Sequence, residues 1–173
     1  MKWQLGVLLW ILTGLLAGCG PQENNPPPSP AADPSSAAST ESSSAGQSAV
    51  RQLVTRFGEQ MRNVSTLAPP DMLRPQLGKV YGDLVTPDLL QQWQNDPSRA
   101  VGREVSSPWP AGIDIKHLYC STASKCHVQG TVRYMTSNET EHGGVAARRP
   151  IDLQLKRIEG GHWRISGVDV GNP

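Results

Sequence analysis

Residues 151–170 read IDLQLKRIEGGHWRISGVDV, and this stretch decides the fold. Apolar and polar side chains alternate from Ile151 to Lys156, which predicts a strand with one buried and one wet face. Glu159-Gly160-Gly161 is typical of a hairpin turn of the Gly-Gly kind, and His162–Val170 predicts the returning strand. Gly167 inside that strand predicts a bulge that resets its register. The stretch therefore predicts an antiparallel hairpin.

Two more strands are predicted before this hairpin, at Ile113–Cys120 and Cys126–Thr136. A helical pattern comes earlier still, where apolar residues recur at the 3-4 spacing of one helical face. These residues are Val50, Leu53, Val54, Phe57 and Met61. We expect an amphipathic helix here, with Ser48 as its cap.

Residues 71–95 carry a weaker helical pattern. Pro75, Gly78 and Gly82 interrupt its first part, so we expect a short irregular helix or turns there. Thr86-Pro87-Asp88 then predicts a clear helix start, because it offers a cap, a proline at the first helical position and a carboxylate at the positive end of the dipole. Helices followed by an antiparallel sheet of about four strands predict an α+β fold.

This order of elements resembles the nuclear transport factor 2-like (cystatin-like) superfamily. The matching features are the first helix with Phe57, the helix restart at Asp83–Leu90 and the closing strand Gly161–Ile165. The resemblance covers residues 48–170. It implies N-terminal helices packed on a curved antiparallel sheet, and some members of the superfamily are enzymes that use Asp, Tyr or His in a cavity between the two layers.

The chain begins with the features of an export signal. Lys2 precedes an apolar segment, Leu5–Leu16, whose dozen or so residues are too few to cross a bilayer of about 30 Å. Leu16-Ala17-Gly18-Cys19 follows and closely resembles the lipobox of bacterial lipoproteins. The resemblance implies a thioether-linked diacylglycerol on Cys19, with acyl chains such as palmitate, and cleavage before that residue.

The composition predicts three parts: a signal peptide at residues 1–18, a lipid-anchored tether at 19–47, and a single domain at 48–173. The tether is rich in Pro and Ser and has almost no large apolar side chain, so we expect it to be disordered. The expected location is the cell membrane or the outer membrane, on the extracytoplasmic side. With a net charge of +1, the chain has no basic field that would favour nucleic acid.

Setting Cys19 aside leaves two cysteines, Cys120 and Cys126, in a compartment where disulfides persist. Pairing them across a hairpin opposes Leu118 and Val128, stabilises the fold by about 2 kcal/mol and predicts a bulge in the first strand. Two free thiols are the second alternative. A metal site is the third, with two histidines added at His117 and His127, although strand parity points each histidine away from its neighbouring cysteine.

Four residues are candidates for contacts in a cavity or on the surface: Tyr81, Trp109, His117 and Tyr134. Asp114 joins them as a candidate if the domain is an enzyme. They form no recognisable catalytic motif, and the sequence indicates no cofactor and no resident metal. We expect Trp109, in a Pro-rich loop, to act as a lid, a packing residue or a contact surface.

These features favour a membrane-anchored binding or scaffold domain, an accessory part of an envelope assembly, with a protein or a small ligand as its partner. The alternative is a small-molecule-binding or isomerase-like enzyme that uses the internal cavity. The two differ in one structural property: an enzyme needs an open pocket with an ionisable group such as Asp114 or His117, whereas a scaffold fills that space with side chains such as Phe57 and Trp163.

Overall fold

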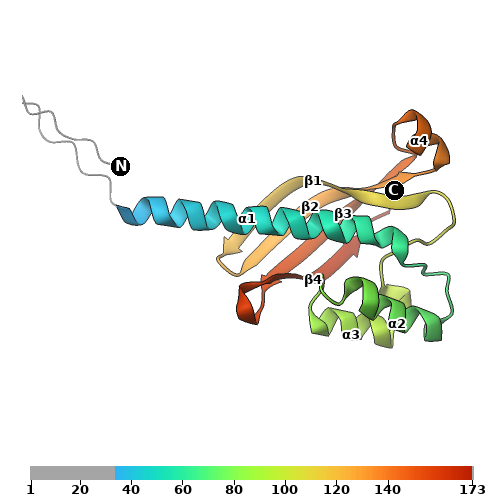
Figure 1. Cartoon of the computed structure of the whole chain (residues 1–173), viewed down its shortest axis with the longest axis horizontal. Helices are drawn as coiled ribbons and strands as arrows, with labels where there is room; N and C mark the ends of the chain where they lie inside the picture. The colour runs from blue at the N-terminus through green and yellow to red at the C-terminus, as the bar shows by residue number, and fades with distance from the viewer. Residues whose placement is uncertain (1–33, 173) are drawn as a thin grey trace, which may run out of the picture. The chain divides into compact units, whose positions relative to one another are not determined.

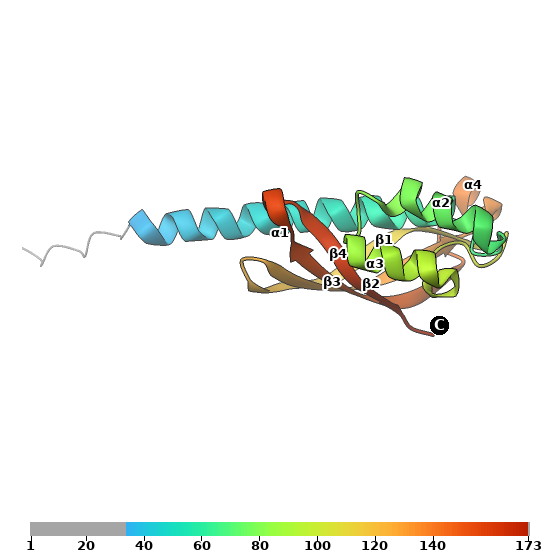
Figure 2. The same ribbon diagram turned by 90° about the horizontal axis from the view of Figure 1, so that it is seen from below.

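The computed structural model describes residues 34–172 of the 173-residue chain. Helices come first: α1 (Pro34–Gln60), α2 (Pro70–Tyr81) and α3 (Pro87–Asn95). Four strands follow, β1 (Trp109–Thr122), β2 (Lys125–Met135), β3 (Ala147–Arg157) and β4 (Trp163–Val170), with the short α4 (Ser137–His142) between β2 and β3. The strands form an antiparallel sheet in the order β1-β2-β3-β4, and α1 runs along one face of it (Figures 1 and 2). The predicted α+β class is confirmed.

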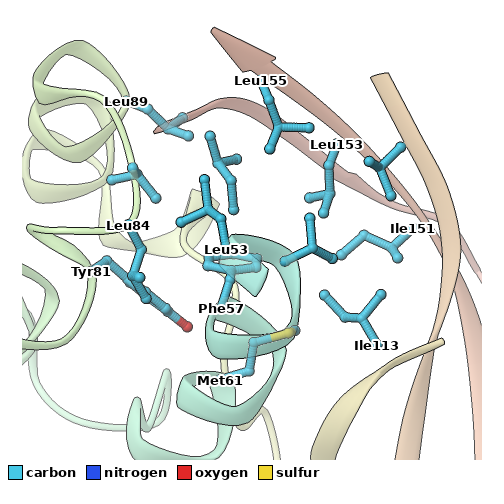
Figure 3. Close-up of a cluster of buried hydrophobic side chains, with 14 of the residues drawn as sticks. Leu53, Phe57, Met61, Tyr81, Leu84, Leu89, Ile113, Ile151, Leu153 and Leu155 are labelled. Atoms are coloured by element: carbon cyan, nitrogen blue, oxygen red, sulfur yellow. The ribbon is translucent and has the colours of Figure 1, made fainter. Parts of the chain in front are cut away.

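The predicted apolar face of α1 forms the centre of the core. Val50, Val54 and Phe57 are fully buried, and Leu53 and Met61 nearly so. The same core takes side chains from alternate positions of the sheet, namely Val128, Val132, Ile151, Leu153, Leu155 and Ile165 (Figure 3). Burial of one helical face against one sheet face is the main stabilising term in such a fold.

Gly58 allows α1 to approach β1 closely. A Cβ atom at this position would lie 2.8 Å from the backbone nitrogen of Ile113 and 3.0 Å from its Cγ1. Backbone atoms cannot move aside easily, so a larger residue at Gly58 would push the helix off the strand. The glycine therefore sets the distance between the helix and the sheet at β1.

The start of α1 differs from the prediction. The helix begins at Pro34 rather than after Ser48, so Ser48 lies inside the helix and is not its cap. Residues 34–47, which the composition assigned to a disordered tether, are helical. Residues 34–47 are rich in alanine, which favours a helix, and in serine, which disfavours it only weakly. They can therefore extend a helix whose second half is already held by packing. Residues 19–33 of the predicted tether and Cys19 lie outside the described residues.

The second helix also differs from the prediction. α2 is one continuous helix despite Pro75 in its interior. Pro75 costs the bond to the carbonyl of Asp71, but Leu73, Leu77 and Tyr81 on the opposite face are all buried, and their burial offsets that loss. The start of α3 agrees with the prediction, because the hydroxyl of Thr86 accepts a bond from the backbone of Leu89, with Pro87 at the first position.

The segment before α3 attaches the helices to the edge of the sheet. The backbone N–H of Thr86 donates to the carbonyl of Ile165 at 2.8 Å, and the N–H of Ile165 donates to the carbonyl of Leu84 at 3.0 Å. In addition to these two backbone bonds, the Asp83 carboxylate lies 3.6 Å from the guanidinium of Arg164. These contacts place the start of α3 beside β4.

The β1–β2 hairpin confirms the predicted disulfide. Cys120 pairs with Cys126 in the register, Leu118 opposes Val128, and a disulfide bond joins the two cysteines. The predicted bulge in β1 lies between Ile115 and His117. Because of this bulge, Ile113 pairs with Val132 and lies on the same buried face of the sheet. In an unbroken strand Ile113 would lie on the other face.

The β3–β4 hairpin has the predicted Gly-rich turn. Gly160 and Gly161 have φ values of 81° and 79°, a left-handed conformation that glycine adopts without strain. The predicted bulge in β4 is displaced by one residue: Leu155 pairs with Ile165 and Gln154 with Gly167, so Ser166 is the extra residue. The bulge still resets the register as expected, because Val168 and Val170 return to the apolar side.

Replacing Phe57 by alanine should reveal how much the fold depends on this core. The ring is fully buried, so Phe57→Ala should lower the free energy of unfolding by about 3–5 kcal/mol. Urea denaturation followed by tryptophan fluorescence measures it. Val105→Ala at an exposed position is the control and should change the free energy by less than about 0.5 kcal/mol. Equal losses in the two variants would contradict the proposed core.

The disulfide predicts a second change in stability. The Cys120→Ser, Cys126→Ser double variant should lose about 2 kcal/mol of unfolding free energy, because the unfolded chain is then no longer closed into a small loop. In the presence of reductant, the wild type should lose the same amount and the variant none. Alkylation of both wild-type cysteines without reductant, detected by mass spectrometry, would show that the bond does not form.

Candidate functional site

The space between the helices and the sheet is filled by aromatic side chains. The Phe57 and Tyr81 rings lie with their centroids 5.2 Å apart, and the Tyr81 and Trp93 rings 5.3 Å apart. Trp163 is buried in the same core, as are the aliphatic residues drawn around Phe57 in Figure 3. This is the arrangement expected of a scaffold, since the enzyme alternative requires an open pocket at that place.

Tyr81 is a packing residue with one polar contact. Its hydroxyl donates a 2.8 Å hydrogen bond to the carbonyl of Val101, and no part of the side chain is exposed. Burial raises the pKa of Tyr81 far above its ordinary value, so the phenol stays neutral throughout the physiological range. A neutral phenol that already donates its proton to a backbone carbonyl is unsuited to act as a base.

His117 and Asp114 lie on the other face of the sheet, away from α1. His117 pairs in register with Gln129 and is exposed, and Asp114 lies opposite Thr131. The Asp114 carboxylate is 3.0 Å from Nε of Arg133. Neither side chain therefore reaches the space between the helices and the sheet, where the enzyme alternative would need it.

The same outer face carries a second polar pair. Nε2 of His127 lies 3.1 Å from the Asp152 carboxylate, and the Tyr119 ring packs edge-on against the imidazole at 5.1 Å. Thr131, only 6% exposed, sits between the two pairs, and its hydroxyl has no hydrogen-bond partner among residues 34–172. No helix among residues 34–172 covers this outer face (Figure 2). Its polar side chains along the central strands are therefore in contact with water.

Tyr134 lies on the inner face near one end of the sheet, in a different environment from Tyr81. Arg149 is close by, and it donates to the Glu104 carboxylate at 3.1 Å and to the carbonyl of Gly171 at 3.1 Å. Burial raises the pKa of Tyr134, while Arg149 lowers it and the negative charge of Glu104 raises it. The phenol is again neutral near pH 7.

Trp109 begins β1 opposite Met135 and is half-buried. That position has the parity of the outer face, so its place in the register does not make it a lid over the interior. Both cysteines of the metal alternative, Cys120 and Cys126, are joined in the disulfide. In the described part of the chain, no group of three or more His, Cys, Asp or Glu side chains is placed to hold a metal ion. The sequence-predicted residues are thus divided between two faces and form no common site.

The structure instead presents an open groove between α1 and α2, with a volume of about 900 Å³. The α1 side supplies Arg56, Gln60 and, just after the helix, Asn63. The α2 side supplies residues spaced by three and four positions, which places them on one face of the helix: Met72, Pro75, Gln76, Lys79, Val80 and, beyond its end, Asp83. Ser65, Ala68 and Leu84 complete the lining. We refer to this site as the α1–α2 groove.

The α1–α2 groove combines positive charge with apolar surface. Arg56 and Lys79 have no hydrogen bond or ion pair with any other residue between 34 and 172, and both side chains are exposed. Met72 is 63% exposed, and the neighbouring Leu67 is 68% exposed. Met72 lines the groove and Leu67 precedes Ala68 of its lining, so two exposed apolar side chains occur close to the same groove.

Sequence reasoning missed this groove. The spacing of Met72, Gln76, Lys79 and Val80 is visible in the sequence, but the expectation of an irregular segment around Pro75 concealed it. The facing residues Arg56 and Gln60 lie outside the apolar pattern of the first helix, so the helical spacing alone does not indicate what they face. Only the position of α2 beside α1 reveals that the two faces meet.

No protein-family model, curated protein or solved structure matches this chain. The superfamily resemblance and the lipobox therefore stay predictions. Among residues 34–172, no helix is both long enough and apolar enough to cross a bilayer.

The buried Tyr81 phenol predicts a loss of stability in alkali. The folded state holds this proton more tightly than the unfolded chain, in which tyrosine titrates near pH 10, so the free energy of unfolding should fall as the pH rises above about 10. Tyr81→Phe should reduce this decline, with the remainder due to Tyr134. At neutral pH the variant should lose about 1 kcal/mol, because the bond to Val101 is absent.

Tyr119→Phe is the matched control for this experiment, since Tyr119 is more than half exposed. Urea unfolding of the wild type and both variants between neutral and alkaline pH measures the effect. An alkaline decline of the same size in Tyr81→Phe and in the wild type would contradict the role given to the buried phenol.

Proposed function

We propose that this chain is a lipid-anchored, extracytoplasmic binding protein whose folded domain is a non-catalytic scaffold for a protein partner in the cell envelope. The anchor is Cys19, and the binding part is the domain that contains residues 34–172. The observation that carries the choice of binding over catalysis is the filled interior around Phe57, Tyr81 and Trp93.

The sequence Leu16-Ala17-Gly18-Cys19 supports the anchor. Each buried methylene contributes about 0.8 kcal/mol, so a diacylglycerol with two chains holds a protein on a membrane where one chain would not. The Cys120–Cys126 bond fits the same compartment, because disulfides persist outside the cytoplasm. The α+β order of helices followed by a four-stranded antiparallel sheet is compatible with the proposed resemblance to the nuclear transport factor 2-like superfamily, some members of which are envelope proteins.

Lipidation at Cys19 can be tested directly in a bacterial host. The full chain should incorporate radiolabelled palmitate, and the mature protein should begin at Cys19 with the mass of an added diacylglycerol. Cys19→Ala should abolish both the labelling and the cleavage, because no other atom of the chain replaces the thiol. The Cys120→Ala, Cys126→Ala variant is the matched control, and it should be labelled like the wild type. Undiminished labelling of Cys19→Ala would refute the proposed anchor.

A further inference from the structure

We propose that the α1–α2 groove binds an acidic segment of a partner protein that carries large apolar side chains beside its carboxylates. This inference rests on the proposed function as a binding protein and assigns the surface that binds. It follows from three properties of the groove: its two helical walls, the unpaired positive charge of two side chains and the amide groups that line it.

The two helices leave the walls of the groove without a covering element. α1 presents Arg56 and Gln60 beside its buried face, and α2 presents Met72, Gln76 and Lys79 beside the face that buries Leu73 and Leu77. Residues 61–69 join α1 to α2, and Figure 1 shows α2 beside α3, below the end of α1. A helix that buries one face against the core and keeps Met72 exposed on another has apolar surface available for a partner.

The charge of the groove selects an anionic partner. Arg56 and Lys79 are without a counterion in the described part of the chain, while the one acidic lining residue, Asp83, already lies beside Arg164. Two free cations facing a groove favour carboxylates on the incoming segment and disfavour a basic one. The apolar edge formed by Met72 and Leu67 favours large apolar side chains next to those carboxylates.

Three amide side chains that line the groove are linked by hydrogen bonds. Nδ2 of Asn63 donates to Oε1 of Gln60 at 2.7 Å, and Nε2 of Gln76 donates to the carbonyl of Asn63 at 2.7 Å. These bonds hold the three side chains in place. They leave Nε2 of Gln60, Oδ1 of Asn63 and Oε1 of Gln76 without a partner among residues 34–172, so both donors and acceptors remain for a peptide backbone.

The shape of the groove favours a protein segment over other anionic ligands. A membrane surface is broad and flat, so it does not enter a groove between two helices. A small ligand is normally enclosed on most of its surface, whereas this groove is open to solvent. A segment that lays side chains into the groove and keeps its other face in water fits the observed form.

The test uses the full chain in nanodiscs of phosphatidylcholine, panned against a random peptide library displayed on phage. Selected peptides should combine Asp or Glu with large apolar residues. Synthesised with a fluorescein label, they should bind the Lys79→Glu and Met72→Glu variants at least about tenfold more weakly than the wild type. Peptides in which the acidic residues are replaced by lysine should regain binding to Lys79→Glu and lose it to the wild type.

Lys125→Glu is the matched control, because Lys125 is an exposed lysine on the β1–β2 hairpin and does not line the groove. It should bind the peptides like the wild type. Because Met72 and Lys79 are exposed, thermal unfolding of their variants should match that of the wild type, so weaker binding would not reflect a loss of folding.

Three results would overturn the inference. Selection of no acidic and apolar peptide would show that the groove does not recognise such a segment. Selected peptides that bind all variants equally would place binding on another surface, and the proposed function would then survive while the groove would not. Binding to phosphatidylglycerol vesicles that depends on Lys79 and Met72, without peptide binding, would reassign this surface to the membrane.

Discussion

The structure depends on the contact between α1 and the inner face of the sheet. Val54 and Phe57 of α1 meet alternate residues from the strands, and Gly58 allows the helix backbone to lie against β1 at Ile113. Once this contact is made, the remaining faces of α1 have fixed directions. Arg56 and Gln60 flank one side of the buried face, so the packing of the core also orients one wall of the groove.

The sheet shows the complementary constraint. Helices bury its inner face. Its outer face has no helix over it among residues 34–172, so that face needs polar side chains. Asp114 pairs with Arg133, and His127 pairs with Asp152, so the central strands are polar on that side. Each of these polar pairs is partly exposed and adds little stability. Their effect is to keep an open sheet face from acting as a second hydrophobic surface.

Much of the fold could be predicted from the sequence where local chemistry alone decides the structure. Thr86-Pro87-Asp88 starts a helix whatever surrounds it, and Gly160-Gly161 makes a turn for the same reason. The Cys120–Cys126 pair could also be predicted, because a disulfide across a short hairpin allows few registers. The shape of the α+β domain follows from these elements and from the two hydrophobic periods, 3.6 and 2.

The remaining features could not be predicted, because tertiary packing decides them. Burial of Leu73 and Leu77 keeps α2 continuous through Pro75. The sequence pattern alone does not indicate how strongly these two side chains are buried. The start of α1 at Pro34 likewise depends on a long helix already held by its packed half. The groove is formed by residues of two helices. The helical spacing within either one therefore could not show that Arg56 and Lys79 line the same groove.

α1 also connects the proposed anchor to the proposed binding surface. Whatever path residues 19–33 take, the chain enters the described domain at Pro34, and the groove lies beside Arg56 near the other end of the helix. At 1.5 Å per residue, this separation is about 33 Å along the helix axis. The helix therefore holds the groove about that far from Pro34, and the proposed anchor Cys19 precedes Pro34 in the sequence. An accessory protein that must reach a partner beyond the headgroups would need this separation, and a flexible serine-rich tract of the same length would not enforce it.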